Sequence, residues 1–286
     1  MTRILSRIAE VSEQYEALIV DLWGCYHDGI RPYADAVEAL RAYRRDGGVV
    51  VLLTNAPRPA AHVQQFLDQI GAPRDSHDAI MSSGQACQRA MASGDHGRAF
   101  HYLGPDRDLH MLSDIGLEPV AVEEADALLC TGLADDKADP RIAYADAIRA
   151  WRERGLPMLC ANPDIVVDRG DERLWCAGAL ARAYEEAGGQ VVWFGKPHAP
   201  TYEQTFALIA EIAGREIARE RMLAIGDGIH TDIAGALLQG LDAVFITGGL
   251  AAEEMGPDPE NPEPARLERF LGEEGLEPAY AMGRLR

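Results

Sequence analysis

The stretch Ala17-Leu-Ile-Val-Asp21-Leu-Trp23-Gly24 runs from an apolar segment into a carboxylate. The apolar residues before Asp21 predict a short buried strand, so that Asp21 stands at its carboxyl end. In open α/β sheets the carboxyl ends of the strands face the crevice that binds ligands. The stretch therefore predicts an α/β sheet with an aspartate in its ligand crevice, and it favours an enzyme in which this carboxylate is the nucleophile.

Apolar runs alternate with amphipathic stretches along most of the chain, which is typical of βαβ units and a parallel sheet. The expected strands are 17–21, 49–53, 79–81, 99–103, 127–131, 158–161, 191–194, 222–225 and 243–246. The expected helices include 34–45, 60–70, 140–154, 177–187, 200–213 and 265–272. We predict a doubly wound α/β core.

The polar residues suited to chemistry cluster near positions 21, 54, 196 and 227, and residues ~84–189 carry none of them. This gap predicts a second α/β unit inserted into the first. The expected division is a core of residues 1–83 and 190–286, with an inserted α/β cap at 84–189.

Composition narrows the choice of partners. The 286 residues are 47% hydrophobic and carry a formal net charge of −19, which argues against nucleic acid and anionic membranes as partners. A phosphate ligand would need a local cation. The amphipathic N-terminus resembles no signal peptide, and the five cysteines show no Cys-x-x-Cys spacing. We expect a cytoplasmic protein with reduced thiols.

Four segments follow predicted strands. They are Asp21–Gly29, Leu53-Thr54-Asn55-Ala56-Pro57, Gly195-Lys196-Pro197-His198, and Gly226-Asp227-Gly228 leading to Asp232. Two neighbouring carboxylates, Asp21 and Asp227, repel one another unless a proton or a cation intervenes. Mg²⁺ fits such a pair, because it prefers carboxylate and phosphate oxygens.

The other three segments supply groups for a phosphate. Thr54, Asn55 and Lys196 offer hydrogen-bond donors and one positive charge. Asp232 is expected in the first turn of a helix, where it would cap the helix and support the metal shell. Such a site suits phosphoryl transfer through an aspartyl-phosphate on Asp21.

Plainer interpretations stand beside these. Lys196 could be a solvated surface lysine, and Asp227 and Asp232 could be an ordinary acidic turn and a helix cap. Cys25 could be a nucleophilic thiol, although a small buried hydrophobe suits it better. Trp23 could be a core aromatic residue.

The four segments, in this order, resemble the motifs of the haloacid dehalogenase superfamily of phosphohydrolases. The large insertion, Gly-Lys-Pro and Gly-Asp-x-x-x-x-Asp resemble its NagD-like branch, class IIA. The stretch Ala161-Asn162-Pro163-Asp164, with Gly178, resembles the α/β (C2-type) cap of that branch. Asp164 is then equally a substrate contact from the cap or a turn cap.

The resemblance implies roles for individual residues. Asp21 would be the nucleophile, and Asp21, Asp227 and the backbone carbonyl of Trp23 would bind Mg²⁺. Thr54, with Asn55 beside it, and Lys196 would hold the phosphoryl group. The implied partner is a small phosphorylated metabolite, and cap-mediated dimers in similar proteins allow a homodimer.

The chain departs from the family at residue 23, where the phosphatases carry a second aspartate. That aspartate protonates the leaving oxygen and then activates water, which is typically worth about 10²–10⁴ in rate. Trp23 has only an indole N–H. Either the substrates have good leaving groups, or the substrate or a residue such as His27, Asp28 or His230 supplies the proton, or the site binds phosphate without turnover.

Three functions follow from these options. The first is a Mg²⁺-dependent phosphatase acting on a small phosphate monoester. The second is a phosphate-binding or regulatory protein on the same fold, which Trp23 favours. Cleavage of a carbon–halogen bond at Asp21 is disfavoured, because Asp227 and Lys196 would then have no purpose.

Overall fold

The computed structural model describes residues 2–169 and 172–286, which fold into two compact units. The first unit comprises Met1–Thr54, Gln64–Met81 and Tyr202–Arg286, and the second comprises Asn55–Val63 and Ser82–Thr201. The core and cap limits expected from the sequence differ from these, mainly because residues 55–63 and 190–201 group with the second unit. The predicted limits stay a prediction.

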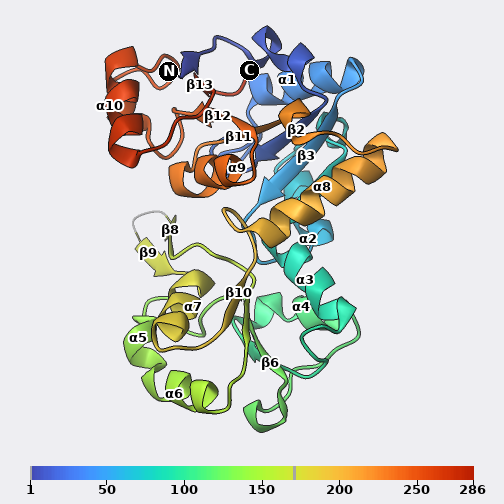
Figure 1. The fold of residues 1–286 in the computed structure, drawn as a ribbon, viewed down its shortest axis with the longest axis vertical. Coiled ribbons are helices and arrows are strands. Elements are labelled where there is room, and N and C mark those ends of the chain that lie inside the picture. Colours follow the sequence, from blue (N-terminus) through green and yellow to red (C-terminus); the bar gives the residue numbers. More distant parts are fainter. Residues whose placement is uncertain (1, 170–171) are drawn as a thin grey trace. The chain divides into compact units, whose positions relative to one another are not determined.

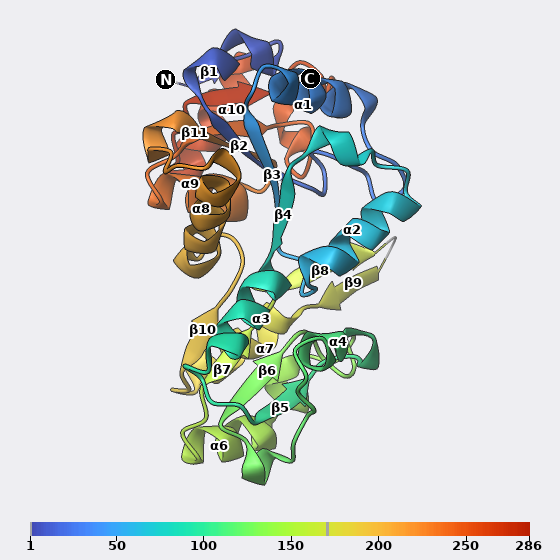
Figure 2. The same ribbon diagram turned by 90° about the vertical axis from the view of Figure 1, so that its right-hand side faces the viewer.

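A seven-stranded sheet forms the centre of the first unit (Figures 1 and 2). Its order is β1-β13-β12-β11-β2-β3-β4, and the pairings that join β1 through β3 are parallel. The strands are β1 (Arg3–Ile4), β2 (Ala17–Asp21), β3 (Val49–Thr54), β4 (Ala79–Ser82), β11 (Met222–Gly226), β12 (Asp242–Ile246) and β13 (Tyr280–Met282).

Helices follow the strands of this unit, as the alternating pattern predicted. They are α1 (Ala34–Arg45), α9 (Ala234–Leu238) and α10 (Pro264–Glu274), together with most of α2 (Ala60–Gln69) and α8 (Ala199–Ala213). A π-helical turn, η7 (Ile229–Ile233), precedes α9. The doubly wound α/β core expected from the sequence is confirmed.

The strand order reverses between β2 and β11. From β2 the chain builds outward through β3 and β4, and it later returns to β11 and builds the other way through β12 and β13. Such a switch point opens a crevice at the carboxyl ends of the strands, where open α/β sheets bind their ligands. The topology therefore places the crevice after Asp21 and Gly226.

Continuous apolar sequence explains why β2 and β3 lie at the centre. All residues of β2 are buried, as are Val49–Leu53 of β3. Parallel strands covered on both faces have such unbroken apolar runs. A short apolar run can belong to a buried strand or to a buried helix. The runs of β2 and β3 are too short for a core helix, so their length favours a strand.

The second unit contains a parallel four-stranded sheet in the order β10-β7-β6-β5. Its strands are β5 (Phe100–Leu103), β6 (Ala127–Cys130), β7 (Met158–Cys160) and β10 (Val191–Trp193), and an antiparallel pair joins β8 (Val166–Arg169) to β9 (Glu172–Trp175). Its helices are α3 (Ser83–Ser93), α4 (His110–Ser113), α5 (Pro140–Ala143), α6 (Ala145–Glu153) and α7 (Ala177–Glu186).

One buried cluster holds this second unit together. It includes Leu128, Trp151, Met158 and Tyr184, which come from β6, α6, β7 and α7. The Tyr184 hydroxyl donates to the backbone oxygen of Leu156 at 2.7 Å, so the polar end of the ring is satisfied inside the cluster.

All nine expected strands are confirmed to within one residue at each end. Residues 140–154, expected as one helix, form two, because Tyr144 departs from helical geometry (φ −110°, ψ 11°). The strands that the pattern missed are β1, β8, β9 and β13, which are two to four residues long. All five cysteines are buried. Across the described residues, no helix is long and apolar enough to cross a membrane.

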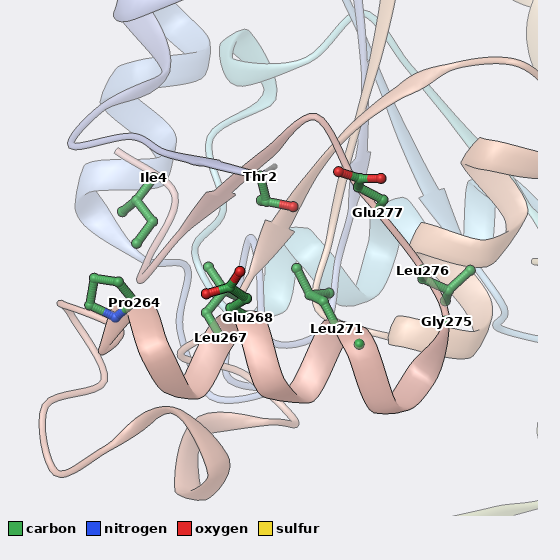
Figure 3. A pocket seen from close by; sticks show the side chains of 10 residues that line it. Thr2, Ile4, Pro264, Leu267, Glu268, Leu271, Gly275, Leu276 and Glu277 are labelled. Carbon is green, nitrogen blue, oxygen red and sulfur yellow. The ribbon is translucent and has the colours of Figure 1, made fainter.

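A hollow of about 520 Å³ lies at the β1 edge of the first unit's sheet, between β1 and α10. Figure 3 shows the side chains that line it, including Ile4, Leu267 and Leu271, with the carboxylates of Glu268 and Glu277. Since β13, β12 and β11 separate β1 from β2, this hollow is distinct from the switch-point crevice.

His77 gives the first unit a testable dependence on pH. Its Nε2–H donates to Gln64 Oε1 at 2.9 Å, and the ring is buried. Burial lowers the pKa of His77 from 6.5 to about 4, assisted by Arg44 and Arg74 and opposed by Asp78 and Asp68. Between these pH values the unfolded chain binds a proton that the folded chain does not, so acid destabilises the fold.

We expect the free energy of unfolding to fall as the pH drops from 6.5 toward 4, with His77 contributing up to about 1.4 kcal/mol per pH unit. In His77→Gln this contribution disappears, so stability should vary less steeply over the same window. Denaturant unfolding at a series of pH values measures the two slopes. Equal slopes would contradict the assignment.

Candidate active site

Two buried carboxylates meet at the switch point of the first unit. Asp21 ends β2, and Asp227 follows β11 directly. The register pairs Val20 with Ile225, so both chains leave the sheet at the same level. Ligand atoms of Asp21, Asp227 and Cys25 all lie within 4.8 Å of one another. Asp21 is only 8% exposed and Asp227 only 4%.

Two glycines leave the space that the Asp227 carboxylate occupies. A Cβ added at Gly24 or at Gly249 would lie 2.1 Å from Asp227 Oδ2, so a side chain at either position would displace the carboxylate. Gly24 also has a φ of +81°, which favours glycine. The backbone N–H of Leu250 donates to the same oxygen at 3.0 Å. The carboxylate is therefore positioned by backbone from two separate loops.

This donor set fits Mg²⁺. Two carboxylates at close range supply hard oxygen ligands, and their mutual repulsion is relieved by a divalent cation. A Cβ on Gly24 would meet Asp227 Oδ2, so the loop that follows Trp23 passes beside the same carboxylate. The Cys25 thiol, which is soft, suits Mg²⁺ poorly.

Asp232 closes the loop that carries Asp227. It lies in the first turn of the π-helical segment η7, a helix turn as expected, and its Oδ2 accepts from the backbone N–H of Gly228 at 3.1 Å. A Cβ at Gly226 would fall 2.2 Å from the Asp232 side chain, so this loop too depends on a glycine.

Thr54 is the last residue of β3, beside β2. The register pairs Asp21 with Leu53, which places Thr54 one residue beyond Asp21 at the same edge of the sheet. Asp21 and Thr54 thus end adjacent strands, and Asp227 follows the next strand, β11, so the three residues lie at one edge of the sheet.

Trp23 lies at the surface, with 59% of the residue exposed, so its interpretation as a core aromatic residue is wrong. Its ring packs edge-on against His27 at a centroid distance of 5.5 Å and covers Gly29, where a Cβ would lie 2.5 Å from the indole. His27 in turn contacts Phe66. The indole is therefore held against its own loop.

Three residues were considered as substitutes for a general acid at position 23, and each interacts with another group. Burial lowers the pKa of His27 to about 4, and its Nδ1 accepts from the N–H of Gly29 at 3.0 Å, so the ring is neutral near pH 7. Hydrogen bonds from the backbone N–H groups of Arg31 and Ile30 lower the pKa of Asp28. His230 Nε2 lies 3.3 Å from Glu274 Oε2.

In the second unit, Asn55 connects two other predicted site residues. Its Oδ1 accepts from the backbone N–H of Lys196 at 2.7 Å, and its Nδ2 donates to the Lys196 carbonyl at 3.1 Å. Nδ2 also donates to Asp164 Oδ1 at 2.9 Å. Both amide hydrogens are thus used, so Asn55 positions the backbone of Lys196 rather than presenting free donors.

The surroundings of these residues are equally close-packed. Lys196 is buried, so its interpretation as a solvated surface lysine is wrong. Gly195 has a φ of +96°, and a Cβ there would fall 2.7 Å from Asn55 Oδ1. The backbone N–H of Gly178 donates to the carbonyl of Asp164 at 3.1 Å. The 161–164 stretch and Gly178, which the sequence singled out together, are in contact.

The sequence did not identify Gly249, Leu250 or Cys25 as neighbours of the carboxylates. Gly248 and Gly249 follow β12 after one residue, Thr247, and paired glycines just past a strand end were the available signal. For Cys25, spacing alone could not distinguish a thiol facing the carboxylates from one facing the core.

Comparisons with known proteins agree with this geometry. A family model described as haloacid dehalogenase-like hydrolase matches residues 18–118, and one described as HAD-hydrolase-like matches residues 193–268. A solved hydrolase of the haloacid dehalogenase-like family from Brucella suis 1330 is 34% identical, with a TM-score of 0.82, and the match covers 99% of this chain and 100% of that one.

Two phosphatases are more distant relatives. The D-glycerol 3-phosphate phosphatase of Mycobacterium tuberculosis is 25% identical over 264 residues, which cover 92% of this chain and 70% of that protein. A p-nitrophenyl phosphatase from Archaeoglobus fulgidus is 21% identical, with a TM-score of 0.73, over 94% of this chain and 96% of that one. The second likeness supports the fold alone.

The chain belongs to the haloacid dehalogenase-like hydrolases. It is therefore a hydrolase of this family, and the resemblance of its four motifs to the haloacid dehalogenase superfamily is confirmed.

A substitution of Gly249 tests whether the Asp227 carboxylate depends on the absence of a side chain there. We expect Gly249→Ala to displace the carboxylate, to weaken Mg²⁺ binding in calorimetry, and to destabilise the protein by about 1–3 kcal/mol through overpacking. Gly272→Ala is the matched control: Gly272 is exposed in α10 and a Cβ there meets nothing within 4 Å. The control should gain about 0.5–1 kcal/mol. Equal behaviour of the two variants would refute the contact.

Proposed function

We propose that this protein is a Mg²⁺-dependent phosphatase that hydrolyses a small phosphate monoester through an aspartyl-phosphate on Asp21. The observation that carries the proposal is the pair of buried carboxylates, Asp21 and Asp227, within 4.8 Å at the switch point. A buried pair of this kind is unfavourable without a cation. Bound at Asp21, Asp227 and the carbonyl of Trp23, Mg²⁺ would neutralise charge on the phosphoryl oxygens.

In the proposed reaction an oxygen of Asp21 attacks phosphorus, and the bond to the ester oxygen breaks with its electron pair. Water then attacks the phosphorus of the aspartyl-phosphate, which releases inorganic phosphate and restores the Asp21 carboxylate. The hydroxyl of Thr54 would donate to a phosphoryl oxygen, and Lys196 would supply the local positive charge that the acidic chain otherwise lacks.

Three further residues would support this site without reacting. Asn55 would fix the backbone of Lys196 through its two hydrogen bonds to it. Asp232 would hold the shape of the loop that carries Asp227, through its bond to Gly228. Asp164, which accepts a hydrogen bond from Asn55, is proposed as a substrate contact.

Relatives support a small substrate. The Mycobacterium tuberculosis relative is described as a D-glycerol 3-phosphate phosphatase. A glycerol phosphate phosphatase from Mycobacterium tuberculosis has been solved in complex with magnesium, at 24% identity and a TM-score of 0.66 over 87% of this chain and 74% of that one. We therefore propose a small phosphorylated metabolite as the partner of this site.

A second candidate function is the binding of a phosphate ligand without turnover. The exposed indole of Trp23, in place of a general acid, favours it. Thermal stabilisation by phosphate compounds, with no release of phosphate from any of them, would select this function over hydrolysis.

Asp21 tests the proposal directly. We expect Asp21→Asn to lose about 10⁴-fold or more of the activity on 4-nitrophenyl phosphate with Mg²⁺, because an amide is a poor nucleophile. The same variant should be at least as stable as the wild type in EDTA, since one of two repelling charges is gone.

Asp35→Asn, at an exposed position in the first turn of α1, serves as the control and should keep full activity. EDTA should abolish wild-type hydrolysis and added Mg²⁺ should restore it. Activity that survives in Asp21→Asn would overturn the nucleophile assignment.

A further inference from the structure

We propose that Trp23 and Leu250 make this site selective for phosphate esters of acidic aromatic alcohols, whose leaving oxygen departs as a phenolate without a proton. The inference rests on the proposed phosphatase function and names its substrate class. Two independent features of the first unit carry it. Residue 23 has no acidic side chain, and two exposed apolar side chains, Trp23 and Leu250, belong to segments that pass beside Asp227.

The first feature concerns the proton. The indole N–H of Trp23 has no useful acidity. Of the nearby groups, His27 uses its Nδ1 lone pair to accept from Gly29, and Asp28 accepts from two backbone N–H groups as a carboxylate. The Nδ1 of His27 and the Asp28 carboxylate are thus both used as acceptors from backbone N–H groups of their own loop. Without a general acid, the rate of P–O cleavage depends steeply on the acidity of the leaving alcohol.

The second feature is the apolar surface. Leu250 is 78% exposed, although its backbone N–H is bonded to Asp227 Oδ2. Trp23 is 59% exposed, although the next residue, Gly24, touches the same carboxylate. Two large apolar side chains thus reach solvent from backbone that is fixed at the proposed metal site.

The indole is also preorganised. It covers Gly29 and meets His27 edge-on, and His27 is anchored by Phe66 and by the N–H of Gly29. A ring held in this way loses little conformational entropy when a second ring stacks on it. Aromatic pairs contribute about 0.5–1.5 kcal/mol beyond the area that they bury, which corresponds to about 2- to 12-fold in affinity.

The atoms balance without an added acid. An oxygen of Asp21 forms the new bond to phosphorus, and the bond from phosphorus to the aryl oxygen breaks with its electron pair on that oxygen. The phenolate leaves as an anion. Water then attacks phosphorus, the Asp21 carboxylate leaves, and the proton of the water passes to solvent or to a phosphate oxygen. An alkyl ester would instead have to expel a strongly basic alkoxide.

The test compares log kcat/KM with the pKa of the leaving phenol across a series of substrates. For ring-substituted phenyl phosphates, kcat/KM reports only the steps through formation of the aspartyl-phosphate. We expect log kcat/KM of the wild type to fall steeply as the pKa of the phenol rises, and glycerol phosphate to be a poor substrate. In Trp23→Asp the dependence should become shallow, and glycerol phosphate hydrolysis should rise by about 10²–10⁴-fold.

Trp23→Asn is the matched control for Trp23→Asp, because it has the same size without the acid and should keep the steep dependence. Leu250→Ala should raise KM for phenyl phosphates several-fold and leave the slope unchanged. Leu238→Ala, an equally exposed leucine at the end of α9, should change neither. Thermal unfolding of each variant confirms that it folds.

Each result has one meaning. A shallow wild-type slope, or equal slopes in Trp23→Asp and Trp23→Asn, overturns the selectivity while leaving an Asp21-dependent phosphatase intact. Absence of turnover of every ester by the wild type, with Asp21→Asn indistinguishable from it, overturns the proposed function and this inference together.

Discussion

The close approach of two buried carboxylates is the constraint on which the first unit depends. Asp21 and Asp227 lie within 4.8 Å of one another, and both are nearly excluded from solvent. Like charges at this range oppose folding unless a cation or proton relieves them. The fold holds them there through the parallel register of β2 and β11, and through Gly24, Gly249 and the N–H of Leu250 around Asp227. This repulsion is what the proposed Mg²⁺ would relieve.

Residue 23 sets the chemistry that such a site can perform. The proposed metal contact uses its backbone carbonyl, so that contact would not depend on residue type. The side chain would decide whether a leaving group receives a proton. With an indole there, turned against Gly29 and His27, the loop offers an apolar face where an acid is expected. In the proposed reaction, binding of the phosphoryl group and protonation of the leaving group would therefore depend on different parts of residue 23.

Much of the fold could be predicted from the sequence because its central strands are unbroken apolar runs, such as Ala17–Val20 and Val49–Leu53, which parallel sheets require. The edge strands escaped prediction for the opposite reason. β1 has only two residues, and β8 and β9 mix charged and apolar residues, so only pairing with a neighbour defines them. The helical pattern of residues 140–154 likewise gave no sign of the break at Tyr144.

By itself, the sequence determined which chemical groups are available: two aspartates after strands, a Gly-Lys-Pro segment, and a tryptophan where the family has an acid. Only the tertiary structure decided how they are held. Spacing along the chain could not place Gly249 and Cys25 beside the carboxylates, or show that the Asn55 amide is fully used by Lys196 and Asp164. These contacts join residues far apart in the chain or depend on which way a side chain faces, and strand register and loop closure set both.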